Sequence, residues 1–152
     1  MLTIGSKAPD FTLQNEVGDL ISLSDFKDQT IVLYFYPKDD TPGCTVQACA
    51  YRDFAVEFIK RGIKVIGISK DDVKSHKRFQ EKYKLNFTIL ADPETIVVQR
   101  YGVWKEKSMY GKKYMGVART TFVIERGLIK AIFENVDPKN DVEKVLNFLD
   151  EK

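Results

Sequence analysis

Short apolar runs alternate with amphipathic stretches along this chain. Residues 30–36 and 63–68 are nearly continuous runs of Ile, Val, Leu and aromatic side chains, and both are too short for typical helices. Runs of this kind, rich in β-branched residues, are typical of strands buried on both faces of a parallel sheet. Residues 89–91 predict a further short strand, and residues 11–13 and 21–23 flank a turn-forming segment, which predicts an amino-terminal hairpin.

Apolar residues at three- and four-residue spacing predict helices between and after these strands. Four helices are expected, over residues 44–61, 72–83, 93–100 and 138–149. Gly62 supplies the left-handed stop of the first helix. Aspartates are the expected N-caps of the other three: Asp71 or Asp72, Asp92 and Asp137. In the last two helices a proline follows the aspartate and is the expected first helical residue.

The order of these elements defines the expected fold. Residues 101–115 mix Gly, Lys and aromatic residues without a period, so a loop with at most one irregular strand is expected there. Residues 120–125 and 128–134 flank Arg126-Gly127 and predict an antiparallel hairpin. The whole pattern predicts an α/β, thioredoxin-like fold, with a mixed central sheet, helices on both faces and an N-terminal β-hairpin extension. A single domain over residues 1–152 is expected from the length.

Composition and charge exclude several classes of protein. The content of 43 % hydrophobic and 12 % aromatic residues excludes a disordered chain. A net charge of +2 is too small for a nucleic-acid-binding surface. The amino terminus lacks the apolar core of a signal peptide and no apolar stretch has membrane-spanning length, so a cytoplasmic location without membrane contact is expected. In that reducing compartment a lasting structural disulfide is not expected. Two cysteines and one histidine cannot complete a structural zinc site, so no metal is expected.

Cys44 lies where the strand of residues 30–36 gives way to the first helix. The free N–H groups and the positive end of the dipole at a helix start stabilise a thiolate, which is the nucleophilic form of a cysteine. Cys49 follows five residues later, and regular helix geometry separates the two Cα atoms by about 8.7 Å. Because a disulfide tolerates at most ~7 Å, an intact helix excludes the bond, and oxidation of this pair requires at least one turn to unwind. The spacing argues against a plain C-x-x-C dithiol function, although Cys49 as a small core residue remains an open alternative.

Other polar and aromatic residues allow two interpretations each. Thr41 either caps the helix or donates to whatever Cys44 attacks, and Pro37 fixes the preceding loop. Arg119 precedes a strand and needs an anion if it is buried, for which a carboxylate is the usual partner. His76, in a polar helix, is expected to be a solvated surface residue. Aromatic side chains of the irregular segment are expected in the core, or else lining a pocket: Trp104, Tyr110 and Tyr114.

Pro37, Thr41 and Cys44 together reproduce the Pro-x-x-x-Thr-x-x-Cys signature of peroxiredoxins. Residues 34–45 closely resemble the subgroup called bacterioferritin comigratory protein or peroxiredoxin Q, and the similarity extends over nearly the whole chain. The resemblance implies that Cys44 is the peroxidatic cysteine and Cys49 the resolving cysteine, with Pro37, Thr41 and Arg119 completing the active site. Related sequences commonly carry Glu where this chain has Gln47, so Arg119 is expected to be fixed less firmly here.

The resemblance also implies the reaction and its partners. The protein is expected to be a thiol peroxidase that reduces hydrogen peroxide and organic hydroperoxides, that is recycled by thioredoxin or a glutaredoxin-type dithiol, and that uses no flavin, haem or metal cofactor. A monomer is expected because the resolving cysteine lies in the same chain. Two alternatives stay open: a thioredoxin-like disulfide oxidoreductase and a non-enzymatic holdase or partner-binding domain.

Overall fold

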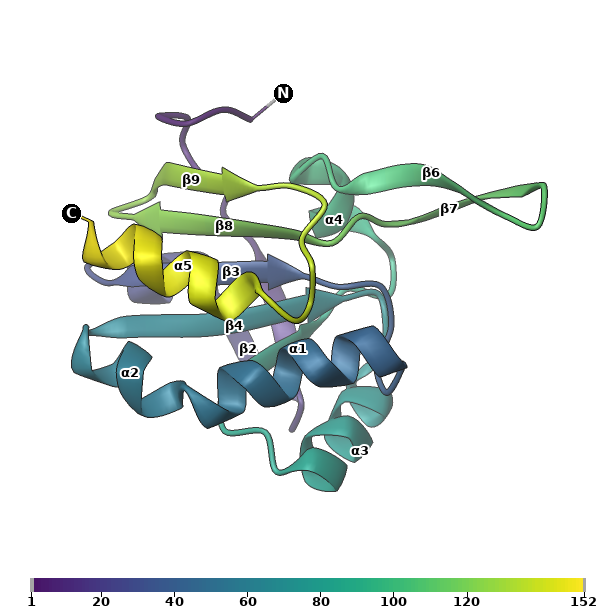
Figure 1. Cartoon of the computed structure of the whole chain (residues 1–152), viewed down its shortest axis with the longest axis horizontal. Helices are drawn as coiled ribbons and strands as arrows, with labels where there is room; N and C mark the ends of the chain where they lie inside the picture. Colours follow the sequence, from purple (N-terminus) through teal and green to yellow (C-terminus); the bar gives the residue numbers. More distant parts are fainter. Residues whose placement is uncertain (1, 152) are drawn as a thin grey trace.

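The computed structural model describes residues 2–151 and contains a central sheet of seven strands in the order β2-β1-β5-β4-β3-β8-β9 (Figure 1). These strands are β1 (Thr12–Asn15), β2 (Leu20–Ser22), β3 (Thr30–Phe35), β4 (Ile63–Ser69), β5 (Thr88–Ala91), β8 (Thr120–Glu125) and β9 (Leu128–Phe133). The helices are α1 (Pro42–Asp53), α2 (Ala55–Lys60), α3 (Val73–Tyr83), α4 (Ile96–Arg100) and α5 (Asp141–Asp150), with a 3₁₀ turn at Leu23–Phe26. Strands β6 (Trp104–Met109) and β7 (Lys112–Val117) form a separate two-stranded sheet.

The central sheet is mixed, as the sequence predicts. β3, β4 and β5 pair in parallel, while β8, β9, β1 and β2 pair antiparallel to their neighbours. β3 lies between β4 and β8, and five of its six residues are buried, which explains its nearly continuous apolar sequence. In β4, Gly67 lets the neighbouring Tyr34 ring pack against the strand, because a Cβ at this position would lie 3.0 Å from that ring.

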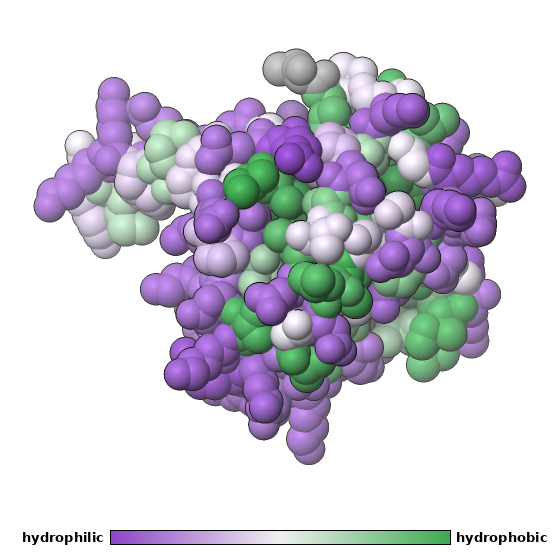
Figure 2. Space-filling view, turned by 180° about the vertical axis from the view of Figure 1, so that it is seen from behind, coloured by the Kyte–Doolittle hydropathy of each residue, from purple (hydrophilic) through white to green (hydrophobic). Residues whose placement is uncertain are grey.

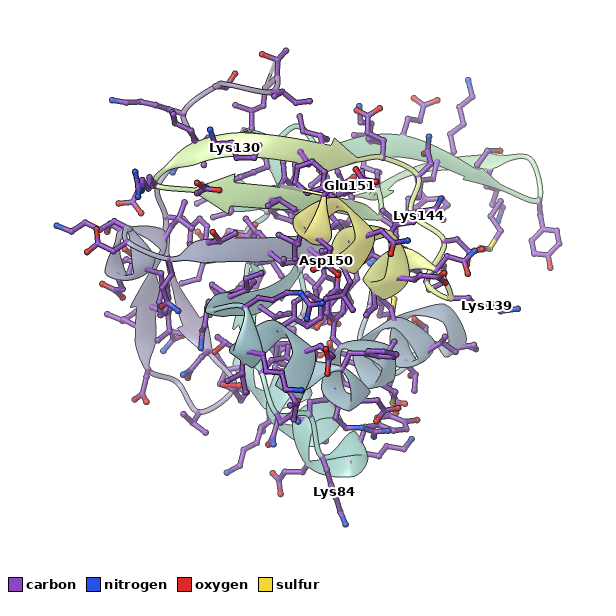
Figure 3. The ribbon with its side chains drawn as sticks, turned by 60° about the vertical axis from the view of Figure 1, so that its left-hand side comes forward. Lys84, Lys130, Lys139, Lys144, Asp150 and Glu151 are labelled. Atoms are coloured by element: carbon purple, nitrogen blue, oxygen red, sulfur yellow. The ribbon has the colours of Figure 1, made fainter. Side chains whose placement is uncertain are left out.

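Helices cover both faces of the sheet, which confirms the thioredoxin-like arrangement. Alternate residues of β3 point to opposite faces, so Leu33 belongs to one apolar cluster and Tyr34 to the other. The first cluster includes residues of α4, and the second includes residues of α1, α2, α3 and α5. Figure 1 shows α1, α2 and α5 in front of the sheet and α4 behind it. Asp150 lies at the end of α5 (Figure 3). Its Oδ1 lies 2.8 Å from Nε of Arg61, which ties this end to the segment after α2.

The segment over residues 101–115 is not a loop with one strand, because β6 and β7 form a regular antiparallel hairpin that projects from the body (Figure 1). Most residues of both strands are exposed, so neither strand carries the alternation of apolar and polar residues that signals a half-buried strand. Tyr110 at its turn is 99 % exposed and Tyr114 is also exposed, so the expectation of core packing is wrong for both. Trp104 is partly buried against the first cluster.

Helix boundaries differ from the sequence predictions at three places. The first predicted helix is split at Phe54 into α1 and α2. α4 begins at Ile96 instead of residue 93, with Thr95 at the N-cap position, and the Asp92 carboxylate accepts the N–H of Val98 (2.9 Å) in its first turn. α5 begins at Asp141 rather than at the residue after Asp137, and a turn fills the interval. The predicted cap of α3 is confirmed, since the Asp72 side chain accepts the N–H of Ser75 (2.8 Å).

Candidate active site

Cys44 lies in the first turn of α1, directly after the loop that leaves β3. Thr41 occupies the N-cap position with extended backbone, and a proline is the first helical residue, which presets the helical φ. The first helical hydrogen bond runs from the N–H of Thr45 to the carbonyl of Thr41 (2.8 Å). The N–H groups of Gly43 and Cys44 therefore precede it, at the helix end whose N–H groups have no carbonyl within the helix to bind. The Cys44 side chain is buried beside this positive end of the helix dipole.

Arg119 brings its guanidinium to the sulfur of Cys44 from the short connection between β7 and β8. Both Nη1 and Nη2 of Arg119 lie 3.5 Å from Sγ of Cys44. Gly43 makes this approach possible, because a Cβ there would lie 3.2 Å from Nη2 of Arg119. The structure thus unites two predicted site residues that are 75 positions apart in the sequence.

The partner of Arg119 is not the carboxylate that residue type alone suggests. Nη1 of Arg119 donates to Oε1 of Gln47 at 2.7 Å, so the guanidinium is shared between an amide oxygen and the sulfur. Gln47 is fully buried and its Nε2 donates to Oδ2 of Asp141 at 3.0 Å. The amide is therefore hydrogen-bonded at both ends.

The loop before α1 is closed by Thr41 itself. Its hydroxyl donates to the carbonyl of Lys38 (2.8 Å) and makes no side-chain hydrogen bond to the helix N–H groups. Thr41 thus stands at the capping position while its hydroxyl binds the loop, which neither sequence interpretation anticipates. Pro37 is half-buried at the beginning of this loop.

Both cysteines are free. Cys49 is half-buried and lies on α1 together with Cys44, two positions from the buried Tyr51. The pair therefore occupies one unbroken helix.

His76 is completely buried, so its assignment as a solvated surface residue is wrong. Its Nδ1 lies 2.6 Å from Oδ2 of Asp39, and its Nε2 lies 2.8 Å from the carbonyl oxygen of Leu90. Asp39 also accepts from the hydroxyls of Tyr36 (2.6 Å) and Ser75 (2.8 Å). The two partners of His76 are distant in the sequence: Asp39 lies in the loop after β3 and Leu90 in β5. No local sequence pattern reveals them.

Asp39, Asp71 and His76 are the described residues that could hold a metal ion, since their ligand atoms lie within 4.8 Å of one another. Each already has hydrogen-bond partners: Asp71 Oδ2 accepts from the N–H of Asp39 (2.9 Å) and from the hydroxyl of Ser69 (2.6 Å). Both ring nitrogens of His76 are likewise engaged. We therefore assign the cluster to holding the loop of the active site.

Arg119 also lines a cavity of about 730 Å³. Its apolar walls include Phe122, Ile132 and Val136. Lys107 of β6 lines it as well, and Gly116, its diagonal neighbour on β7, leaves room for the lysine stem, because a Cβ there would lie 3.2 Å from Cδ of Lys107. Burial lowers the pKa of Lys107, and the positive charge of Arg119 lowers it further. No motif or spacing in the sequence marks this lysine, which lies on a mostly exposed strand.

A thioredoxin-like fold with a cysteine in the first turn of α1 and an arginine at its sulfur defines the class of the peroxiredoxins. The chain belongs to the AhpC/TSA family, whose family model matches residues 4–132.

Within the family, the relatives place the chain in the Bcp or PrxQ subgroup. Peroxiredoxin Bcp of Escherichia coli (strain K12) is 45 % identical over 151 residues, which cover 99 % of this chain and 97 % of the relative. Peroxiredoxin Bcp of Bacillus subtilis (strain 168) is 42 % identical over 149 residues, covering 97 % and 95 %.

Solved structures agree with this placement. PrxQ of Xylella fastidiosa has a TM-score of 0.94 at 32 % identity, covering 99 % of this chain and 97 % of that one. The bacterioferritin comigratory protein of Xanthomonas campestris has a TM-score of 0.88 at 33 % identity, covering 93 % and 90 %. The resemblance seen in the sequence is confirmed.

Proposed function

We propose that this protein is a thiol peroxidase in which Cys44 reduces hydrogen peroxide and organic hydroperoxides. The observation that supports the proposal is the contact of two guanidinium nitrogens of Arg119 with Sγ of Cys44, 3.5 Å each, at the first turn of a helix. The peroxiredoxin relatives support it as well, and the Xanthomonas campestris structure is described for the alkyl peroxide reduction activity of that protein.

In the first step, the Cys44 thiolate attacks one oxygen of the hydroperoxide. An S–O bond forms and the O–O bond breaks, so the sulfur is oxidised to a sulfenic acid. The other oxygen takes up a proton and leaves as water or an alcohol. Arg119 and the N–H groups at the start of α1 stabilise the negative charge that moves from sulfur to oxygen. Thr41 takes part by turning its hydroxyl from the Lys38 carbonyl toward the peroxide, and Pro37 shapes the loop.

In the second step, the Cys49 thiol condenses with the sulfenic acid. A disulfide forms between the two sulfurs and water leaves, after the start of α1 has unwound to bring them together. An external dithiol of the thioredoxin or glutaredoxin type then reduces the disulfide and is itself oxidised. The proposed cycle uses cysteine chemistry throughout and needs no second subunit.

Mass spectrometry of the protein treated with one equivalent of hydrogen peroxide tests the proposal. The expected product has lost two hydrogens and carries a link between residues 44 and 49. Cys44→Ser should abolish peroxide consumption, whereas the matched Cys49→Ala variant should reduce one equivalent and stop as a sulfenic acid.

Other outcomes would assign a different function. Peroxide consumption that persists in Cys44→Ser contradicts the proposed nucleophile. Reduction of insulin disulfides without peroxide consumption favours the disulfide oxidoreductase alternative, and binding of unfolded protein that survives Cys44→Ser, without peroxide turnover in the unaltered protein, favours the holdase. Full turnover of Cys49→Ala with thioredoxin would reassign the resolving role.

A further inference from the structure

Asp141 is a buried acidic residue that the proposed reaction does not use directly. It is the first residue of α5 and is only 2 % exposed. Its Oδ2 accepts hydrogen bonds from Tyr51 (2.6 Å), Thr121 (3.0 Å) and Gln47 (3.0 Å), while its Oδ1 has no partner among the described residues. Burying a carboxylate without a direct cationic partner costs free energy, and this carboxylate is connected to the Cys44 sulfur by three hydrogen bonds in series, through Gln47 and Arg119.

The Asp141 carboxylate determines which end of the Gln47 amide faces Arg119. Arg119 can only donate hydrogen bonds, and a side-chain amide offers one oxygen acceptor and one NH₂ donor. Because Oδ2 of Asp141 takes the NH₂ end, the oxygen end of Gln47 must face Arg119. The reversed amide would place its NH₂ against the guanidinium and its oxygen against Asp141. Burial raises the pKa of the Asp141 carboxyl, but a bound proton would sit on the unpartnered Oδ1, so Oδ2 remains an acceptor in either state.

We propose that Asp141 is a positioning residue for peroxide reduction, acting through the amide of Gln47 to hold Arg119 against the sulfur of Cys44. The inference rests on the proposed function and deepens it. An amide in contact with Arg119 fixes the guanidinium without forming an ion pair with it. The full positive charge of Arg119 is thereby available to the thiolate, and the negative charge of Asp141 stays one side chain further away.

Removing the acceptor at position 141 tests this chain of contacts. Asp141→Ala leaves the NH₂ of Gln47 buried without a partner, frees the amide to turn and loosens Arg119. The rate at which hydrogen peroxide oxidises Cys44 should fall roughly tenfold or more, the usual consequence of losing a hydrogen bond that involves charged groups. Asp141→Asn, which keeps an oxygen for the three donors, should recover most of the rate. Stopped-flow measurement of Cys44 oxidation provides both values.

Asp92→Ala is the matched control. Asp92 is also 2 % exposed and its carboxylate also accepts a hydrogen bond, from the N–H of Val98, but it lies outside the Cys44 site. This variant should lose stability in thermal unfolding while its oxidation rate stays unchanged. An Asp141→Ala protein that folds and reacts as fast as the unaltered protein would overturn the proposal, as would equal rate losses in the two alanine variants.

A second pair of variants tests the positioning role of Asp141 if Asp141→Ala does not fold. Gln47→Glu places two acceptors against each other, so the oxidation rate should fall. Adding Asp141→Asn gives the new glutamate an amide donor, and the rate should rise again. A double variant that is as slow as Gln47→Glu or slower contradicts the positioning role.

A readout without peroxide separates this inference from the proposed function. Iodoacetamide alkylates thiolates, and mass spectrometry can follow its addition at Cys44 at neutral pH. The variants should be alkylated in the same order of rates as hydrogen peroxide oxidises them, because Arg119 stabilises the Cys44 thiolate in both reactions. If the unaltered protein is alkylated rapidly but does not reduce peroxide, the proposed function fails, while the order of the alkylation rates still decides the role of Asp141.

Discussion

A single histidine shows how strongly burial changes what a residue does. His76 has an acceptor at each ring nitrogen, the Asp39 carboxylate at Nδ1 and the Leu90 carbonyl at Nε2. The imidazole satisfies both only when both nitrogens carry hydrogen, which is its cationic form. Burial by itself lowers the pKa of His76, but the hydrogen bond and the negative charge of Asp39 outweigh it. The pKa is therefore raised above its ordinary value of 6.5.

The raised pKa of His76 predicts a pH dependence of stability. Below pH 6.5 the histidine is protonated in both the folded and the unfolded chain, and its full stabilisation is present. As the pH rises from 6.5 through the higher pKa of the folded state, the folded protein binds more protons than the unfolded one, so the free energy of unfolding falls. Asp39 and Asp71, the carboxylates that face the ring from the two adjoining loops, both favour the cation.

Urea unfolding of the unaltered protein and of His76→Gln, in parallel across this pH range, measures the effect. The difference in unfolding free energy between the two proteins should shrink as the pH rises above 6.5. The glutamine can still bind Asp39 but does not titrate, so it controls for all other ionisable groups. A difference that is constant or grows with pH would show that the buried imidazole is neutral.

At the scale of secondary structure, the sequence predicts the strands and helices whose residues follow one regular pattern of burial. β3 and β4 are identified because both of their faces are covered, which leaves a continuous apolar run. The β6–β7 hairpin is not predicted, because most of its residues are exposed. The spacing of apolar residues also does not predict the split of the first helix at Phe54. Local capping patterns locate α3 correctly but place the start of α5 too early, because the turn before it also uses Asp137, which accepts the N–H of Lys139 (2.9 Å).

The sequence likewise predicts only part of the candidate site. The motif around Cys44 is contiguous, so the sequence reveals it, and Arg119 is recognised by its place before β8. Asp141 is 94 positions from Gln47, and the Asp39 partner of His76 is 37 positions away. Such contacts depend on how α3 and α5 dock on the sheet, which the periodicity of a single chain does not specify.

Helix α1 is the element on which the proposed cycle acts. Forming the disulfide requires the Cα atoms of Cys44 and Cys49 to approach from about 8.7 Å to below ~7 Å. The first turns must then leave their places, which breaks the contacts of Gln47 with Asp141 and Arg119 and exposes the buried Ala48. A disulfide that closes so short a loop restricts the unfolded chain only weakly, so the loss of packing dominates.

We therefore expect the oxidised protein to have a lower melting temperature than the reduced one, the reverse of the usual effect of a disulfide. Calorimetry of the two forms measures the difference. Hydrogen exchange should locate lost protection in the first half of α1, with β3 and β4 unchanged. Cys49→Ala treated with peroxide is the control, since it is oxidised without forming the link and should keep its protection. An oxidised form with a higher melting temperature and a protected α1 would show that the helix does not unwind.

At the scale of the whole molecule, the exposed apolar residues are spread along the chain. Exposed large apolar residues come from seven separate stretches of the chain: residues 4, 17–20, 46, 54–59, 96, 109–115 and 128. On the face seen in Figure 2, apolar side chains lie in separate spots between hydrophilic ones. None of the helices in residues 2–151 has the length and apolar character needed to cross a membrane.

The location of both cysteines on α1 makes a second subunit unnecessary for the proposed chemistry in either redox state. Unwinding α1 moves residues within one chain, whereas a stable homodimer has to bury roughly 1,000 Å² or more between two chains. Light scattering coupled to size-exclusion chromatography should give a mass near 17.5 kDa for the reduced and the oxidised protein alike, independent of concentration. A doubled mass in the reduced form that is halved on oxidation would instead mean that the folded start of α1 contributes to an interface between two copies, and that its unwinding controls assembly.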